Sequence, residues 1–211
     1  MSQSNNIVLC VPTREERDGI LKFLPNDSAV QFEITGMGVM QTAFHICEMY
    51  TRLHPTYIVH MGVAGSYKKS LGVGDVAEIK SEAMADFGAE DAHKSHITFQ
   101  QIVPSIDPNH GPWSKGLLLN ASTNTYNLQE VTGLTVPFAS GSIETIARRQ
   151  SYDCDIENME GAGLFYACLS LDIPFTSIRA ISNIVEPRNK SAWNFEQAFQ
   201  GLAHFIQSNF L

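Results

Sequence analysis

Glu16 stands where a carboxylate could activate water. It lies shortly after the apolar run Ile7 to Val11, and open α/β sheets bind ligands just past the carboxyl ends of their strands, where a carboxylate can act as a general base. Thr13 and Glu16 also match the Thr-x-x-Glu pattern of a capping box, in which the glutamate only closes a helix N-terminus. The pattern alone leaves both interpretations open.

A second carboxylate, Glu160, belongs to the acidic stretch Glu157 to Gly163, which is predicted to open a helix. A carboxylate fixed there can accept hydrogen bonds from two ribose hydroxyls. The alternative is structural, because acids at a helix N-terminus are favoured by the helix dipole and small residues allow close packing.

Asn183 follows the apolar run Phe175 to Ser182, which is predicted to be a buried strand. An amide at the carboxyl end of a strand can read the hydrogen-bonding edge of a base, although asparagine is also common in turns.

Other polar patterns are weaker. Gly36-Met37-Gly38 resembles a dinucleotide turn, but Gln41 stands where the third glycine is required. His93 and His96 have no third ligand nearby, and His60 within an apolar strand is typical of a satisfied core residue. We therefore predict no metal and no cofactor.

The elements that must position these residues alternate between short β-branched runs and longer stretches of helical period, which is typical of an α/β domain. The predicted strands are 7–11, 31–35, 57–63, 73–81, 133–139 and 175–182. The predicted helices are 13–24, 39–53, 142–149, 159–171 and 195–210. The segment 100–130 is predicted to be a loop-rich excursion with one short element, of the kind that covers a site.

Composition limits the possible partners. The chain has 211 residues and is 44% hydrophobic, enough for a single domain spanning 1–211. A net charge of -8 argues against nucleic acid, and the N-terminal apolar run is too short for a signal peptide or a membrane span. We therefore predict a cytoplasmic protein without membrane contact. No Cys-x-x-Cys pair occurs among the cysteines, so we predict that they are reduced core residues: Cys10, Cys47, Cys154 and Cys168.

Taken together, several segments make the chain similar to the nucleoside phosphorylase and nucleosidase superfamily, and within it to the futalosine hydrolases of bacterial menaquinone synthesis. The resemblance covers most of the chain and rests on the order and spacing of its motifs. These are Pro12-Thr13-x-x-Glu16, 35–38, 62–65 with 74–76, 86–90, 157–162, and 179–183 followed by Arg188 and Trp193.

The resemblance implies a three-layer α/β/α sandwich around a mixed, largely parallel sheet, assembled as a homodimer or higher homo-oligomer. It implies that Glu16 activates water and that Met159 and Glu160 bind ribose. It implies base contacts from Val63, Gly65, Phe138, Ala139 and Asn183, with Phe138 stacking on the base, although the spacing after Phe138 differs by one residue.

Asn183 also bears on the substrate that the resemblance implies, because adenosine-type nucleosidases of this superfamily carry aspartate there. An amide can donate toward a 6-oxo group or nitrogen 7, which suits hypoxanthine. The expected activity is therefore hydrolysis of futalosine to hypoxanthine and dehypoxanthine futalosine, with Arg188 and Trp193 meeting the carboxylated tail.

Three alternatives remain open. A methylthioadenosine/S-adenosylhomocysteine nucleosidase would share the catalytic residues. A purine nucleoside phosphorylase would need clustered arginines for phosphate, and the turn from Gly62 to Gly65 has none beside it. A non-catalytic nucleoside-binding protein on the same fold would not require Glu16.

Overall fold

The computed structural model describes residues 6–93, 96–106, 111–122 and 124–211. The N-terminal residues 1–5, on which the expected absence of a leader segment partly rests, lie outside the described residues. Among the described residues, no helix is long and apolar enough to cross a membrane.

Within this part of the chain the main sheet has nine strands, and a separate two-stranded sheet pairs β5 with β6. The strands are β1 (Ile7–Val11), β2 (Glu33–Ile34), β3 (Tyr57–Ser66), β4 (Val76–Met84), β5 (Gly88–Glu90), β6 (His96–Thr98), β7 (Trp113–Ser114), β8 (Leu117–Leu119), β9 (Gln129–Thr135), β10 (Ile156–Asn158) and β11 (Phe175–Ile184). The helices are α1 (Arg14–Leu21), α2 (Val39–Leu53), α3 (Phe99–Ile106), α4 (Ile143–Gln150), α5 (Gly161–Ser170) and α6 (Phe195–Phe210), with a 3-10 turn at Lys190–Ala192.

The main sheet closes on itself. β3 pairs with β10, β10 with β9, β9 with β4, β4 with β11, and β11 again with β3, so these strands form a continuous cycle. Parallel and antiparallel pairs both occur in the cycle, which agrees with the predicted mixed sheet. The three-layer sandwich that the resemblance implied stays a prediction.

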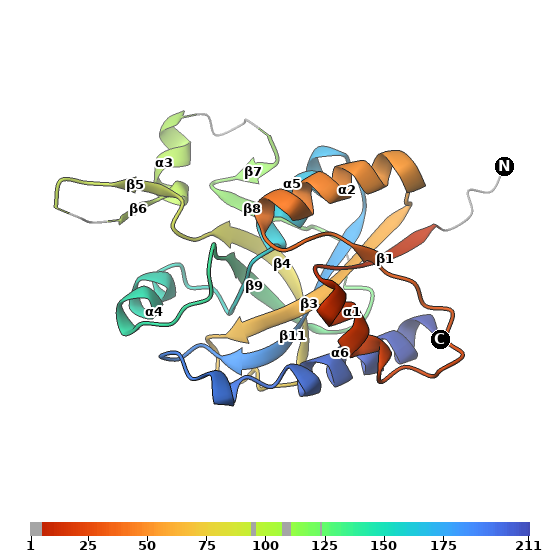
Figure 1. The fold of residues 1–211 in the computed structure, drawn as a ribbon. Helices are drawn as coiled ribbons and strands as arrows, with labels where there is room; N and C mark the ends of the chain where they lie inside the picture. Colours follow the sequence, from red (N-terminus) through yellow and green to blue (C-terminus); the bar gives the residue numbers. More distant parts are fainter. Residues whose placement is uncertain (1–5, 94–95, 107–110, 123) are drawn as a thin grey trace.

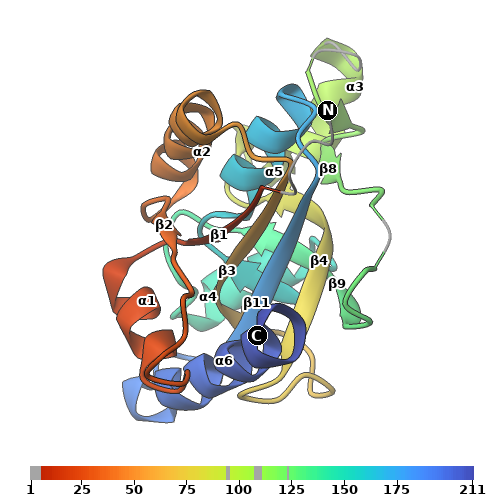
Figure 2. The ribbon, with the colours of Figure 1, turned by 90° about the vertical axis from the view of Figure 1, so that its right-hand side faces the viewer.

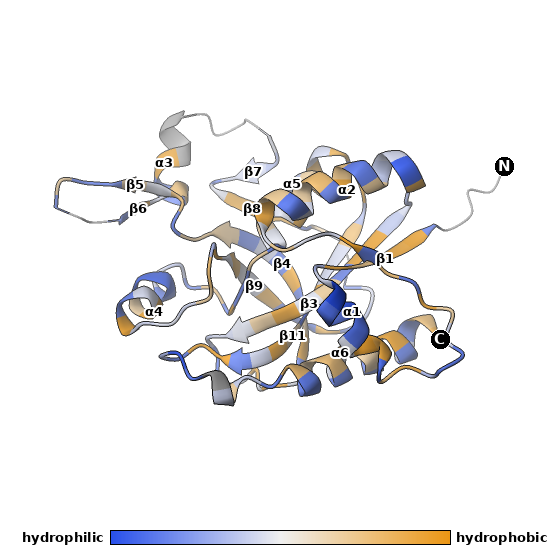
Figure 3. Cartoon of the chain, in the orientation of Figure 1, coloured by the Kyte–Doolittle hydropathy of each residue, from blue (hydrophilic) through white to orange (hydrophobic). Residues whose placement is uncertain are grey.

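Helices cover the sheet from two sides (Figures 1 and 2). α2 and α5 pack on one side, and α1 and α6 pack on the other. Figure 3 shows hydrophobic residues along the central strands and hydrophilic residues on the outer faces of α1 and α4. The hydrophobic effect therefore holds each helix to the sheet through the face that is turned inward.

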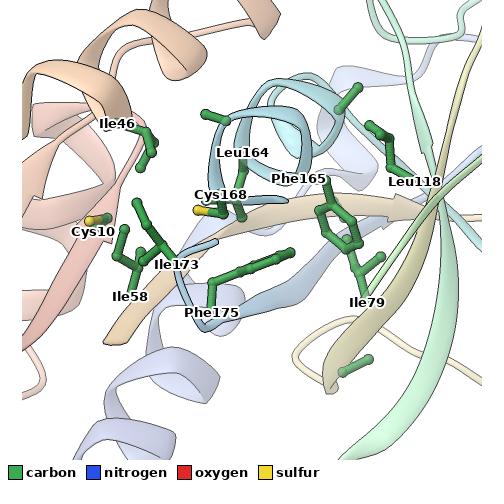
Figure 4. Close-up of a cluster of buried hydrophobic side chains, with 14 of the residues drawn as sticks. Cys10, Ile46, Ile58, Ile79, Leu118, Leu164, Phe165, Cys168, Ile173 and Phe175 are labelled. Atoms are coloured by element: carbon green, nitrogen blue, oxygen red, sulfur yellow. The ribbon is translucent and has the colours of Figure 1, made fainter. Parts of the chain in front are cut away.

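The core beneath α2 and α5 is built from large aliphatic and aromatic side chains (Figure 4). The rings of Phe165 and Phe175 meet edge to face, with centroids 4.8 Å apart, and neither side chain is more than 2% exposed. Close contact between the two helices requires Gly163, because a Cβ there would overlap the backbone of Val39. α2 and α5 are thereby held against each other above the sheet.

Several predicted bounds need correction. Helices 39–53 and 195–210 have the predicted ends, whereas the predicted strands 73–81 and 133–139 are displaced to β4 and β9. β9 ends at Thr135, and Val136 after it donates to the Asn158 carbonyl of β10 at 2.8 Å and lines a cavity. The helix predicted from Met159 begins at Gly161, since Glu160 is its N-cap.

Shorter elements also differ from the prediction. The first helix ends at Leu21, the strand predicted at 31–35 shrinks to β2, and β3 continues to Ser66. Among the described residues of 100–130, α3, β7 and β8 form where one short element was predicted, and β8 joins the main sheet beside β4. β8 is stabilised by pairing with β4, which is distant in the chain, so the local sequence pattern does not predict it.

The cysteines are all free, as predicted, but they do not all lie in the core. Cys10 and Cys168 are buried, Cys154 is half-buried, and Cys47 is exposed on α2. The apolar residues around Cys47 belong to the inward face of an amphipathic helix, and Cys47 itself lies on the outward face.

Candidate active site

A cavity of about 470 Å³ opens where β1, β3 and β11 end, next to the turn between β10 and α5. β3 lies between β1 and β11 and runs parallel to both, so the carboxyl ends of all three strands meet at one edge. The cavity is lined by Pro12, Thr13, Glu15, Glu16, Met37, Val63, Ala64, Gly65, Val136, Ala139, Glu157, Asn158, Met159, Glu160, Ser182, Asn183, Trp193, Phe195 and Phe199.

Glu16 reaches this cavity from the first turn of α1. Its backbone N–H donates to the Thr13 hydroxyl at 3.1 Å, so Thr13 caps the helix as predicted. Its carboxylate, however, does not return to the Thr13 backbone. Oε2 accepts from the Thr13 hydroxyl at 2.8 Å, and Oε1 accepts from the backbone N–H of Val63 at 3.1 Å. The residue therefore belongs to the helix start and to the cavity wall at once.

Burial dominates the electrostatics of Glu16. Only 8% of the residue is exposed, and burial together with the nearby carboxylate of Glu160 raises its pKa to about 7. The hydrogen bonds from Thr13 and Val63, and the charge of Arg179, act in the opposite direction. A carboxyl with a pKa near neutrality can both accept and release a proton there, which suits a general base.

Glu160 connects α5 to α2 across the cavity. It is the N-cap residue of α5, and its Oε1 accepts from the backbone N–H of Gly38 at 3.0 Å, immediately before α2 begins. Gly38 has φ 84°, a left-handed conformation that glycine adopts without strain. Burial raises the pKa of Glu160, while the charge of Arg179 lowers it.

Arg179 belongs to the motif 179–183, but no role was predicted for it from the sequence. It is fully buried in the middle of β11, and its Nη1 donates to the carbonyl of Ile178 at 2.9 Å. Nε and Nη2 have no hydrogen-bond partner among the described residues. Burial lowers the pKa of Arg179, whereas the charges of Glu160, Glu82 and Glu16 raise it. The charges of three carboxyls therefore act on this guanidinium.

His60 supports this guanidinium from β3. Its Nδ1 lies 3.2 Å from Arg179 Nη1, and its Nε2 lies 2.9 Å from the Thr35 hydroxyl. Because arginine can only donate, Nδ1 is the acceptor and the imidazole is neutral. Burial, followed by the charge of Arg179, lowers the pKa of His60 well below its usual value. The prediction of a satisfied core histidine is confirmed.

Glu82 was not predicted as a site residue, because no recognisable motif surrounds it in β4. It is fully buried, and it accepts from the Thr135 hydroxyl at 2.8 Å and from Asn158 Nδ2 at 2.6 Å. A Cβ at Gly161 would overlap its carboxyl, so glycine is required there. Burial raises the pKa of Glu82 to about 7.

The partners of Glu82 hold the start of α5. Asn158 Oδ1 accepts from the backbone N–H groups of Glu160 at 3.0 Å and Gly161 at 2.6 Å, and the Thr135 hydroxyl accepts from Ala162 N–H at 2.7 Å. These are donors that a helix N-terminus leaves without an internal partner. Glu82 thus fixes, through two intermediates, the turn that carries Met159 and Glu160.

Most of the predicted site residues lie together. The cavity wall includes Glu16, Val63, Gly65, Ala139, Met159, Glu160, Asn183 and Trp193. Phe138 and Arg188 are not among the lining residues. Phe138 is 53% exposed, and its ring centroid lies 4.4 Å from the Arg149 guanidinium carbon. The guanidinium carbon of Arg188 lies 5.4 Å from the ring centroid of Trp193.

Gly65 on β3 lies between Glu157 on β10 and Asn183 on β11 in the sheet. Asn183 Oδ1 accepts from the Ser182 hydroxyl at 2.9 Å, and its Nδ2 donates to the Ile184 carbonyl at 3.1 Å. One hydrogen of Nδ2 therefore remains available for a ligand. Among the described residues, no three His, Cys, Asp or Glu side chains are grouped so that they could hold a metal ion.

Comparison with known proteins extends this description. Residues 29–207 match the phosphorylase superfamily. The futalosine hydrolase of Thermus thermophilus is 26% identical over 176 residues, which cover 82% of this chain and 77% of that protein. The 5'-methylthioadenosine/S-adenosylhomocysteine nucleosidase of Colwellia psychrerythraea is 26% identical over 184 residues, covering 80% and 72%.

A solved structure shares the fold. A mutant of the Helicobacter pylori methylthioadenosine nucleosidase, with 5'-methylthioadenosine in its active site, superposes with a TM-score of 0.75 at 17% identity. The superposition covers 98% of each chain.

The raised pKa of Glu82 predicts a pH-dependent stability. Because the folded pKa of about 7 exceeds the ordinary value of 4.5, the folded state binds more protons between these values, and its free energy of unfolding falls as pH rises through them. Glu82→Gln removes this titration. We expect the wild-type free energy of unfolding to fall, relative to that of the variant, by at most about 1.4 kcal/mol per pH unit.

Urea unfolding at intervals from pH 4 to pH 8 measures this difference. Glu90→Gln, which changes an exposed glutamate on β5, is the matched control and should give a curve parallel to the wild type. A Glu82→Gln curve that is also parallel would contradict the assignment.

Proposed function

The chain belongs to the phosphorylase superfamily, and we propose that it is a nucleosidase that hydrolyses the bond between a purine base and ribose. The observation that carries this proposal is the pairing of Glu16 and Glu160 in one cavity, both buried and both near Arg179. One carboxylate can take a proton from water while the other accepts hydrogen bonds from the sugar.

In the proposed mechanism the glycosidic carbon–nitrogen bond breaks first and its electron pair stays on the base. Positive charge then develops on the ribose, and the buried carboxylates Glu16 and Glu160 favour that charge. Glu16 removes a proton from the attacking water, whose oxygen bonds to the anomeric carbon. Asn183 donates a hydrogen bond to the departing base. An amide is not an acid at neutral pH, so solvent supplies the proton that the base takes up.

Arg179 supports the same mechanism from a fully buried position that is not part of the cavity wall. Its Nε and Nη2 face no partner among the described residues, and a buried guanidinium with free donors is costly. The charge of Arg179 lowers the pKa of both Glu16 and Glu160 and so favours the ionised carboxylates that the mechanism needs.

Water is favoured over phosphate as the attacking group. Among the described residues that line the cavity there is no lysine or arginine, whereas Glu15, Glu16, Glu157 and Glu160 all line it. A phosphate dianion would meet these carboxylates without a cationic partner. The charge of the cavity wall thus supports hydrolysis.

We propose futalosine as the substrate, and a role in menaquinone synthesis. The amide of Asn183 suits the 6-oxo group of hypoxanthine, and a futalosine hydrolase is among the relatives of this chain. The second candidate is a methylthioadenosine/S-adenosylhomocysteine nucleosidase, which the relative from Colwellia favours. The base that is released distinguishes the two.

The rest of the substrate is assigned as follows. Ribose contacts Met159 and Glu160, and the base lies near Val63, Gly65 and Ala139. Stacking of Phe138 on the base stays a prediction, because its ring lies against Arg149 and Phe138 is not among the lining residues. The tail runs toward Trp193, where Arg188 meets its carboxylate.

We also propose that the protein forms a homodimer or higher homo-oligomer. Met40 and Phe44 on α2 are 86% and 67% exposed, and Met37 just before the helix lines the cavity. Exposed apolar side chains on one helix are typical of an interface between protein subunits.

The substrate proposal is tested with futalosine, inosine and methylthioadenosine, each incubated with the protein in the presence and absence of phosphate. We expect hypoxanthine from futalosine, independent of phosphate, in a chromatographic assay of released base. Adenine release from methylthioadenosine would favour the second candidate. A requirement for phosphate would contradict hydrolysis, and no release from any substrate would contradict an enzymatic role.

Glu16→Gln tests the general base. We expect a loss of about 10²- to 10⁴-fold in turnover with the fold intact. Because Glu16 must be ionised and its pKa is about 7, wild-type kcat/KM should fall as pH drops below neutrality, and the variant should lose this acidic limb. Asp18→Asn, an exposed carboxyl on the same helix, is the control. Unchanged turnover in Glu16→Gln would remove Glu16 from the mechanism.

Arg188→Ala tests the contact to the substrate tail. We expect a higher KM for futalosine and an unchanged KM for inosine, which lacks the carboxylated tail. Arg52→Ala, an exposed arginine on α2, controls for the loss of one positive charge. Equal effects on both substrates would reject the contact.

A further inference from the structure

Glu157 is a buried carboxylate in the cavity wall that the proposed mechanism does not use. We infer that it determines the class of base by accepting a hydrogen bond from the N1–H of a 6-oxopurine. The inference rests on the proposed function, because it concerns the base of the same nucleoside.

The sheet places Glu157 beside the residue that is proposed to read the base. Glu157 on β10 and Asn183 on β11 are both paired in register with Gly65 on β3. A Cβ added at Gly65 would lie 3.2 Å from Asn183 Nδ2 and 3.4 Å from Glu157 Cγ. Both polar side chains therefore lie close to Gly65, which has no side chain to separate them. All three residues line the cavity.

The Glu157 carboxylate is held by three donors. Oε1 accepts from the Ser140 backbone N–H at 2.8 Å, while Oε2 accepts from the Ser140 hydroxyl and from the Tyr67 hydroxyl, both at 2.6 Å. Two carboxylate oxygens offer about four acceptor positions. Oε1 is engaged by a single donor, so one acceptor position remains on a carboxylate that is only 5% exposed.

Arg149 stabilises this arrangement from behind. It is fully buried, and its Nη1 donates to the Ser140 hydroxyl at 2.9 Å and lies 3.8 Å from Glu157 Oε2. Asp86 accepts from Arg149 Nη2 at 2.6 Å and so fixes the orientation of the guanidinium. The carboxylate is thus a fixed acceptor that cannot turn without breaking several hydrogen bonds.

This geometry distinguishes two classes of purine. A 6-oxopurine has a hydrogen on N1 and an acceptor at O6, so Glu157 can accept from the first while Asn183 Nδ2 donates to the second. A 6-aminopurine has an unprotonated acceptor at N1 and donors at position 6. Its N1 would face a carboxylate oxygen with no proton between them, which leaves a buried acceptor unpaired.

The competing interpretation is that Glu157 only anchors Ser140 and the segment beside it. In that case its replacement would weaken binding of every base by a similar factor. The ratio of affinities for hypoxanthine and adenine separates the two interpretations, whereas activity alone does not.

Glu157→Gln is the informative variant, because it keeps the size of the side chain and can turn an amide donor toward adenine N1. The affinities of hypoxanthine and adenine are measured by calorimetry, and kcat/KM is measured for inosine and adenosine. We expect the wild-type preference for the 6-oxopurine to fall by about 10- to 100-fold in the variant. An unchanged ratio would overturn the inference.

Tyr67→Phe is the matched control, since it removes one hydrogen bond from the same carboxylate and keeps the acceptor. It should retain the wild-type preference, and loss of the preference in this variant would also count against the inference.

A measurement on the unaltered protein covers the case in which Glu157→Gln does not fold. 1-Methylhypoxanthine, which lacks the N1 hydrogen, should bind at least about 10-fold more weakly than hypoxanthine, and equal affinity would overturn the inference. Failure of the proposed function is distinguishable, because free bases test Glu157 even if the protein cleaves no nucleoside.

Discussion

The buried guanidinium of Arg179 is the constraint on which the site depends. A charged side chain inside a protein is tolerated only when opposite charges and hydrogen bonds compensate for lost hydration. Here the compensating carboxyls are Glu16 from α1, Glu82 from β4 and Glu160 before α5. These elements are far apart in the chain, yet the charges of their carboxyls all act on one guanidinium.

The same grouping has consequences for stability and for chemistry. Three carboxyls around one guanidinium leave an excess of negative charge, and burial moves the pKa values of Glu16 and Glu82 to about 7. Ionising them in the folded protein is unfavourable, which destabilises the fold as pH rises. An enzyme that builds positive charge on a ribose would benefit from that excess, so a cost in stability is consistent with a functional site.

The hydrogen bonds of the site extend into the elements around it. Glu82 orders the first turn of α5 through Asn158 and Thr135, and Glu160 joins that turn to the start of α2. Arg149 and Ser140 hold Glu157 in the same manner. The cavity wall is therefore supported by buried polar networks in which each side chain has a defined partner.

Local patterns in the sequence were sufficient for the bounds of α2 and α6, and for placing Glu16, Glu160 and Asn183 near the cavity, because helical period and strand ends are properties of contiguous residues. Closure of the sheet was decided only in the tertiary structure, and with it the burial of Glu82 and the position of Glu157 beside Asn183. Glu82 follows Lys80 and Ser81 in β4, and nothing in these neighbours indicates a fully buried carboxyl. Its environment is made by β9 and the turn before α5, so it depends on pairing between residues that are distant in the chain.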